Sequence, residues 1–133
     1  MIVLDASALL ELLLNTQAGR AIASRLADPA VAVHVPHLID LEIAHALRRL
    51  IESGELSEEI GAAALADLRA LDLQRHAHEP LLDRIWELRD HVGPADAVYL
   101  ALAEVLDAEL LTCDGRLPRA PGATRRVRLI ATA

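Results

Sequence analysis

The chain has 133 residues, of which 53% are hydrophobic and 25% charged; these values are typical of a globular domain and exclude a disordered tail. We therefore expect residues 1–133 to form a single domain around one sizeable core. The formal net charge of −7 argues against broad binding to nucleic acid, although five arginines gather near the end of the chain, at positions 116, 119, 125, 126 and 128.

The basic residues and the single cysteine exclude further classes of protein. All 13 basic residues are Arg and no Gly-rich loop ends in Lys, so the chain is not a phosphate-loop NTPase. Cys113 alone excludes an internal disulfide and fits a reduced compartment. No apolar run reaches the roughly 20 residues that span a bilayer, and the first strand begins at once, without a cleavable signal. We expect a cytosolic protein that does not associate with membranes.

Apolar spacing, caps and helix breakers predict an alternation of strands and helices. In chain order, the predicted elements are a strand at 1–4, helices at 7–14 and 17–26, a strand at 30–35, helices at 37–53 and 57–71, a minor strand at 73–74, helices at 79–91 and 95–106, and strands at 109–113 and 127–130. Ser7 is the expected N-cap of the first helix. This order favours an α/β fold, a three-layer sandwich in which helices flank a central, mostly parallel sheet.

Asp5 is the most informative single residue, because it closes the first apolar strand directly before a helix. Open α/β sheets bind ligands at the carboxyl ends of their strands, so Asp5 is a candidate site residue. For Asp5 alone, a turn or capping acid is an equally good interpretation, since Asp-x-Ser before a helix is common capping chemistry. Ser7 can cap the helix, hydrogen-bond a neighbouring carboxylate, or do both.

Three further acids lie in mostly apolar stretches, namely Glu42, Asp96 and Asp114. Each also has an ordinary interpretation. Glu42 can pair with Arg49 on its own helix. Asp96 suits the dipole of the helix that it begins, and Asp114 suits a turn. Asp40, which precedes Glu42 by two residues, lies in a first helical turn and is not expected in a site.

Four carboxylates brought together would repel each other unless a cation held them, so these acids predict a metal site. Without the metal, repulsion should raise the pKa of at least one of them. Carboxylate oxygens are the ligands that Mg²⁺ prefers. The six histidines lack the spacing of a zinc site, and Cys113 is interpreted as a small buried hydrophobe rather than a nucleophile.

Four segments together carry a resemblance to a known family. They are M-I-V-L-D-A-S-A at 1–8, the helix of Glu42, D-A-V-Y-L-A-L-A at 96–103 and L-L-T-C-D-G-R-L at 110–117. In this order, over nearly the whole chain, they resemble a PIN domain and, more narrowly, the VapC toxins of bacterial toxin–antitoxin pairs. Any one segment is a weak signal, and the ordered set is a strong one.

The resemblance implies an endoribonuclease that depends on Mg²⁺ or Mn²⁺ and hydrolyses RNA phosphodiester bonds as the toxin of a toxin–antitoxin pair. The residues that match the family's catalytic and metal-binding acids are Asp5, Glu42, Asp96 and Asp114, and those that match its supporting hydroxyls are Ser7 and Thr112. Some members carry a further acid after the fourth one. Here Gly115, Arg116 and Leu117 follow, so a second metal would be weakly held or would need an RNA phosphate.

The resemblance also implies partners, which are an RNA substrate, a cognate antitoxin that blocks the site, and a second copy of the chain in a homodimer. An arginine of the C-terminal cluster is expected to hold the RNA backbone, and Arg116 is the candidate.

Two other classes stay open. The first is a catalytically idle interaction module whose acids cap helices. The second is an aspartyl-nucleophile phosphatase, which also begins with a strand that ends in Asp but needs another Asp two residues later, where this chain has Ser7.

Overall fold

The computed structural model describes residues 1–120, 123 and 126–132, and its centre is a five-stranded sheet. The strand order is β3-β2-β1-β4-β5, and all four neighbouring pairs are parallel. The strands are β1 (Ile2–Leu4), β2 (Val33–Pro36), β3 (Leu73–His76), β4 (Glu109–Thr112) and β5 (Val127–Leu129). The helices are α1 (Ala6–Leu13), α2 (Gln17–Arg25), α3 (Leu38–Glu52), α4 (Glu58–Ala70), α5 (Leu82–Glu87) and α6 (Pro94–Leu106), with 3-10 turns η1 (Glu79–Leu81) and η2 (Leu117–Arg119). The predicted α/β class and the parallel sheet are confirmed.

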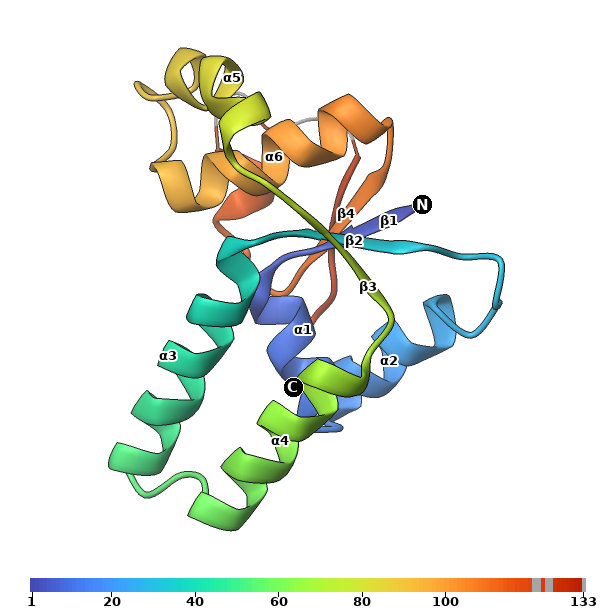
Figure 1. Cartoon of the computed structure of the whole chain (residues 1–133), viewed down its shortest axis with the longest axis vertical. Coiled ribbons are helices and arrows are strands. Elements are labelled where there is room, and N and C mark those ends of the chain that lie inside the picture. Colours follow the sequence, from blue (N-terminus) through green and yellow to red (C-terminus); the bar gives the residue numbers. More distant parts are fainter. Residues whose placement is uncertain (121–122, 124–125, 133) are drawn as a thin grey trace.

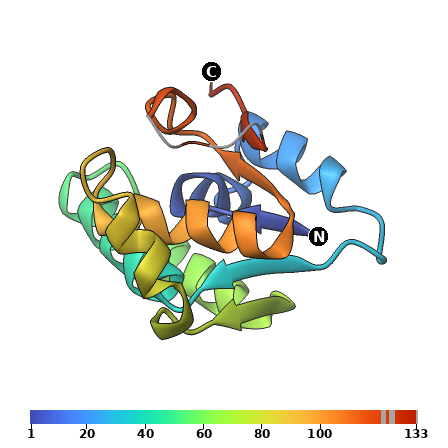
Figure 2. The same ribbon diagram turned by 90° about the horizontal axis from the view of Figure 1, so that it is seen from above.

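Helices cover both faces of the sheet and complete a three-layer sandwich (Figure 1). α5 and α6 lie on one side of the sheet, and α1 to α4 lie on the other, where α3 and α4 form a hairpin that extends away from the strands. Figure 2 shows α5 and α6 side by side from above. The helices of the described part of the chain lack the length and apolar content that crossing a membrane would need.

The core lies around the two central strands. Val3 and Leu4 of β1 and Leu110 and Leu111 of β4 are fully buried, because both faces of a parallel sheet are covered. This burial explains why these strands are continuous apolar runs rather than alternating ones. α6 packs against them with every residue from 97 to 103 buried, as the nearly all-apolar sequence predicted.

The expected N-cap of the first helix was wrong: the cap is Asp5, not Ser7. Asp5 has extended backbone angles (φ −85°, ψ 175°), and its carboxylate accepts a hydrogen bond from the Ala8 N–H at 3.0 Å. Ser7 already lies within the first helical turn, so its hydroxyl is available for other partners.

Two other elements differ in length from the prediction. The helix expected at 79–91 is η1 followed by α5, which ends at Glu87. Beyond the cap residue Leu88, the N–H groups of Arg89 and His91 bond three residues back, to Trp86 O at 3.2 Å and Leu88 O at 2.9 Å, so the regular helix gives way to turns before α6. The minor strand at 73–74 is longer than expected, because all four residues of β3 pair with β2.

α1 and α2 approach each other so closely at Gly19 that a side chain has no room. A Cβ there would lie 2.0 Å from the carbonyl oxygen of Glu11 and 3.0 Å from the Cα of Leu12. Both are backbone atoms, so neither can rotate away. Gly19→Ala should therefore lower the free energy of unfolding by roughly 1–3 kcal/mol, although Ala is favoured over Gly in helices by about 1 kcal/mol.

Urea unfolding monitored by circular dichroism would measure this change. Gly115→Ala is the matched control, because the same methyl group would meet only Leu129 Cδ2, at 4.0 Å. Its effect should stay within about 0.5 kcal/mol. Equal effects of the two substitutions would contradict the close packing of α1 on α2.

Candidate functional site

The four predicted acids lie at the carboxyl edge of the sheet. Asp5 follows β1 and Asp114 lies two residues beyond β4, its paired neighbour. Glu42 belongs to α3, which begins after β2, and Asp96 lies in the first turn of α6. The charges interact: Asp114 raises the pKa of Asp5 and of Asp96, while Asp96 and Asp5 raise that of Glu42. The fold therefore brings the four acids into one electrostatic neighbourhood.

Asp5 is the innermost acid, and only 7% of its surface is exposed. Its Oδ1 accepts hydrogen bonds from the Ser7 hydroxyl at 2.7 Å and from the Ala8 N–H, and its Oδ2 accepts one from the Thr112 hydroxyl. Burial raises the pKa of Asp5, the three hydrogen bonds oppose that rise, and Asp114 adds to it. Desolvation, rather than the predicted repulsion, is thus the main cause of the raised pKa.

Ser7 and Thr112 join the ends of β1 and β4 through their hydroxyl groups. Besides donating to Asp5, Ser7 Oγ accepts the Cys113 N–H at 2.8 Å, and Thr112 Oγ1 accepts the Asp114 N–H at 3.0 Å. The two hydroxyl oxygens are 3.3 Å apart. Both side chains therefore fix the position of Asp5 relative to the backbone that carries Asp114.

Glu42 is half-buried and is held by Tyr99, a residue that the sequence analysis missed. The Tyr99 hydroxyl donates a hydrogen bond to Glu42 Oε1, so Glu42 does not pair with Arg49. Burial raises the pKa of Glu42, and the Tyr99 bond partly offsets the rise. The sequence did carry a signal for Tyr99: this single tyrosine follows Asp96 by three residues, which places both on one face of α6.

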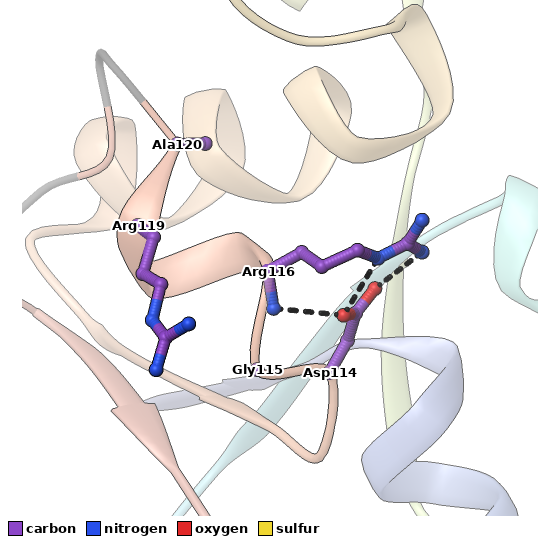
Figure 3. Close-up of a pocket in the computed structure, with 5 residues that line it drawn as sticks. All are labelled: Asp114, Gly115, Arg116, Arg119 and Ala120. Atoms are coloured by element: carbon purple, nitrogen blue, oxygen red, sulfur yellow. Dashed lines mark hydrogen bonds and ion pairs between the residues drawn. The ribbon is translucent and has the colours of Figure 1, made fainter.

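Asp96 and Asp114 form the outer part of the edge. Partial desolvation and the charge of Asp114 raise the pKa of Asp96. The pKa of Asp114 is lowered instead, chiefly by its side-chain hydrogen bonds with Arg116. Arg116 donates from Nε to Oδ1 at 3.1 Å, from NH2 to Oδ2 at 2.9 Å, and from its backbone N–H to Oδ1 at 3.0 Å (Figure 3).

A hollow of about 560 Å³ opens beside this pair, lined by Asp114, Gly115, Arg116, Arg119 and Ala120 (Figure 3). A second hollow, of about 300 Å³, is also lined by Asp114 and Arg116 and reaches Asp96. The remaining arginines of the C-terminal cluster lie elsewhere: Arg126 pairs with Asp107, Arg128 pairs with Glu109, and residue 125 is outside the described part of the chain.

Two residues set aside by the sequence analysis are Asp40, which is ion-paired, and Cys113, which is partly buried rather than the buried hydrophobe expected. Asp40 forms a two-pronged ion pair with Arg75, with both N–O distances 2.9 Å. Burial raises the pKa of the Cys113 thiol to about 11, so the thiol stays protonated at neutral pH and is no nucleophile.

The donor set fits a hard divalent cation, since it consists of carboxylates, three of them with raised pKa values, backed by hydroxyls. As these side chains stand, however, no three His, Cys, Asp or Glu within the described residues form a ready metal-binding group. Both oxygens of Asp114 are turned to Arg116. Holding a cation would thus require small side-chain movements at this edge.

Comparison with known proteins agrees with the fold. The sequence profile of the PIN domain matches residues 2–123. Ribonuclease VapC1 of Mycobacterium tuberculosis is 41% identical over 129 residues, which cover 96% of each chain. Among solved structures, VapBC2 from Rickettsia felis, bound to a DNA fragment from its promoter, has a TM-score of 0.69 at 16% identity and covers 97% of this chain and 98% of that one. A toxin–antitoxin complex from Klebsiella pneumoniae has a TM-score of 0.68 at 15% identity, with full coverage of both chains.

Asp5→Asn should leave the metal-free protein at least as stable as the wild type at pH 7. Because burial raises the folded-state pKa of Asp5, the native state holds a proton there that the unfolded chain releases near pH 4. The corresponding stability is complete below about pH 4 and is lost as pH rises through the folded pKa. Asn keeps an oxygen for the Ala8 N–H without the charge.

Melting curves in EDTA between pH 4 and pH 8 would measure the difference, which should shift in favour of the variant as pH rises. A variant that becomes steadily less stable than the wild type over this range would show that the Asp5 charge stabilises the fold.

Proposed function

Because the chain belongs to the PIN domain family, we propose that it is an endoribonuclease that hydrolyses RNA phosphodiester bonds. We propose Mg²⁺ or Mn²⁺ as its cofactor, and that the protein is the toxin of a toxin–antitoxin pair. The observation that carries the proposal is the acidic edge. Four acids from four separate segments share one electrostatic neighbourhood, and the pKa of three of them is raised.

We assign the metal to Asp5, Glu42, Asp96 and Asp114. When bound, the cation would supply positive charge beside the phosphoryl oxygens and would acidify a water molecule. Ser7 and Thr112 fix the carboxylate of Asp5, and Tyr99 fixes that of Glu42. With these groups pre-oriented, little reorganisation would remain at the moment of reaction. Arg116 contacts the outer acid Asp114, and Arg119 lines the same hollow, where both would meet the RNA backbone.

Water is the proposed nucleophile, because the chain offers no good covalent one. The Cys113 thiol is protonated at neutral pH, and the hydroxyl of Ser7 is engaged with Asp5 and the Cys113 N–H. Direct attack by water would leave a 5′-phosphate and a 3′-hydroxyl.

The proposed partners are RNA, a small antitoxin protein and a second copy of the chain, in the cytosol. Relatives named as VapC ribonucleases support RNA, and the similar structure of a toxin–antitoxin complex supports the antitoxin. A homodimer is favoured by large apolar side chains left in solvent, among them Leu41 at 72%, Leu82 at 52% and Trp86 at 67% exposure.

An idle interaction module remains the second candidate, and specific contacts favour it. Asp5 caps α1, Asp114 is paired with Arg116, and no ready three-ligand metal group exists among the described residues. The phosphatase alternative is less favoured, because both oxygens of the nearly buried Asp5 already accept hydrogen bonds.

Purified protein should cleave bacterial RNA when Mg²⁺ or Mn²⁺ is present and should stop when EDTA is added. The physical reason is that a site of carboxylates alone cannot offset the charge that develops on the phosphate. Sequencing of the RNA ends should find 5′-phosphates and 3′-hydroxyls. Cleavage that persists in EDTA would overturn the metal mechanism, and absence of cleavage on every RNA with either metal would favour the idle module.

Substitutions should separate the site acids from acids that have structural partners. Asp5→Asn and Asp96→Asn should each lower the cleavage rate at least about 100-fold, which corresponds to about 2.7 kcal/mol of transition-state stabilisation. Asp40→Asn and Asp107→Asn are the matched controls, because these acids pair with Arg75 and Arg126 away from the edge, and they should change the rate little. An inactive Asp40→Asn beside a fully active Glu42→Gln would show that the wrong acid of α3 was chosen.

A further inference from the structure

Arg116 is the one positive side chain in direct contact with the acidic edge among the described residues. Its guanidinium engages both oxygens of Asp114 in a two-pronged pair. The two partners differ in exposure: the Arg116 side chain is 90% exposed, whereas that of Asp114 is 27% exposed. The arginine thus reaches in from solvent and covers an acid that is fixed to the protein.

The guanidinium of Arg116 occupies the carboxylate of Asp114, which is one of the proposed ligands of the cation. Besides pairing with Asp114, it lowers the pKa of Asp96, the neighbouring acid. A guanidinium and a divalent cation that share the carboxylate of Asp114 would repel each other at short range. The arginine therefore competes with a metal ion for the same negative charge.

Arg116 can leave Asp114 by rotation of its side chain, because that side chain is 90% exposed and water can solvate the freed guanidinium. Its side chain has no other hydrogen-bond partner in the described part of the chain. The Arg116 side chain also has space to move into, because a hollow lies on each side of the pair. Asp114 and Arg116 line both hollows, so their pair lies between the hollow that reaches Asp96 and the hollow that holds Arg119.

Arg119 adds a second guanidinium to the larger hollow, of about 560 Å³. Within the described residues its guanidinium makes neither an ion pair nor a hydrogen bond, and Figure 3 shows it on the far side of the hollow from Asp114. Two guanidinium groups at one hollow suit a phosphate group, which accepts paired hydrogen bonds from arginine.

We propose that Arg116 is an exchangeable counter-ion: it neutralises Asp114 in the metal-free protein, leaves when a divalent cation binds, and then binds an RNA backbone phosphate together with Arg119. The inference rests on the proposed function and adds to it an order of events, in which binding of the cation prepares the phosphate-binding hollow. Metal and RNA backbone should consequently strengthen each other's binding by the same factor.

Mg²⁺ titration by calorimetry, without any nucleic acid, tests the exchange. Arg116→Gln should bind Mg²⁺ about twofold to fivefold more tightly than the wild type, because the competing charge is gone. Arg116→Lys, which keeps the charge, should bind Mg²⁺ like the wild type, and so should Arg119→Gln, which is not in contact with the acids. Weaker or equal Mg²⁺ binding by Arg116→Gln would overturn the exchange and would mean that Arg116 instead orients Asp114 for the metal.

The phosphate role needs a second measurement, the fluorescence anisotropy of a labelled single-stranded oligodeoxynucleotide with and without Mg²⁺, with a gel to verify that the probe stays intact. In the wild type, Mg²⁺ should strengthen binding of the probe. Arg119→Gln should weaken binding in both conditions and keep the gain, whereas Arg116→Gln should lose at least half of it. An undiminished gain in Arg116→Gln would overturn the phosphate role.

The same data separate this inference from the proposed function. If Asp96→Asn and the wild type bind Mg²⁺ equally weakly, the metal site itself is wrong, and the exchange fails with it. If the wild type binds Mg²⁺ and Asp96→Asn does not, but Arg116→Gln shows no gain in affinity, only the exchange fails.

Discussion

The carboxylate of Asp5 connects three parts of the molecule. Through the Ala8 N–H it caps α1, through Thr112 it ties the end of β1 to the end of β4, and through Ser7 it reaches the backbone at Cys113. Only 7% of the Asp5 surface is exposed, so water cannot replace these hydrogen-bond partners. The group that orders the carboxyl edge of the sheet is thus also the innermost acid of the candidate site.

The acids of this edge are stabilised in two different ways. Asp5 and Glu42, the more buried ones, accept hydrogen bonds from neutral donors, which are hydroxyls and an N–H. Such donors satisfy the oxygen atoms without cancelling the charge, so burial still raises the pKa of both acids. Asp114, further out, is held by the charge of Arg116, and its pKa is lowered. The inner acids therefore have no protein counter-ion of their own among the described residues, while the outer Asp114 is paired with Arg116.

This arrangement links the PIN fold to its proposed chemistry. In a parallel sheet the carboxyl ends of all strands meet at one edge, so acids placed after separate strands converge without any local sequence signal that joins them. The short loops after β1 and β4 are held by hydrogen bonds, because Ser7 accepts the Cys113 N–H from the other loop and Thr112 accepts the Asp114 N–H within its own loop. At the rim, the solvent-exposed Arg116 covers Asp114. Hydrogen-bonded inner acids beside an exposed outer cation suit a site that would accept both a metal and a polyanion.

The sequence by itself determined the features that depend on neighbouring residues. The class, the parallel sheet and the buried helix α6 all followed from apolar spacing and helix position, and the structure bears them out. The exclusion of Asp40 from the site stays a prediction, and the structure pairs Asp40 with Arg75. The four acids were chosen from their places after strands and at helix starts. Their assignment to a metal remains a prediction, although the fold does bring their charges together.

Only the tertiary structure decided which partner each side chain takes. Local capping rules allow Asp5 or Ser7 at the start of α1; in the fold Asp5 is the cap, and its other oxygen accepts a hydrogen bond from Thr112 of β4. Tyr99 meets Glu42 across 57 residues of sequence, because α6 packs beside the start of α3 at the edge of the sheet. The pKa of a carboxylate is raised or lowered by its burial and by the charges around it. Neither can be read from the order of residues along the chain. The spacing of residues along the chain predicts the position of an acid, and tertiary packing determines its pKa.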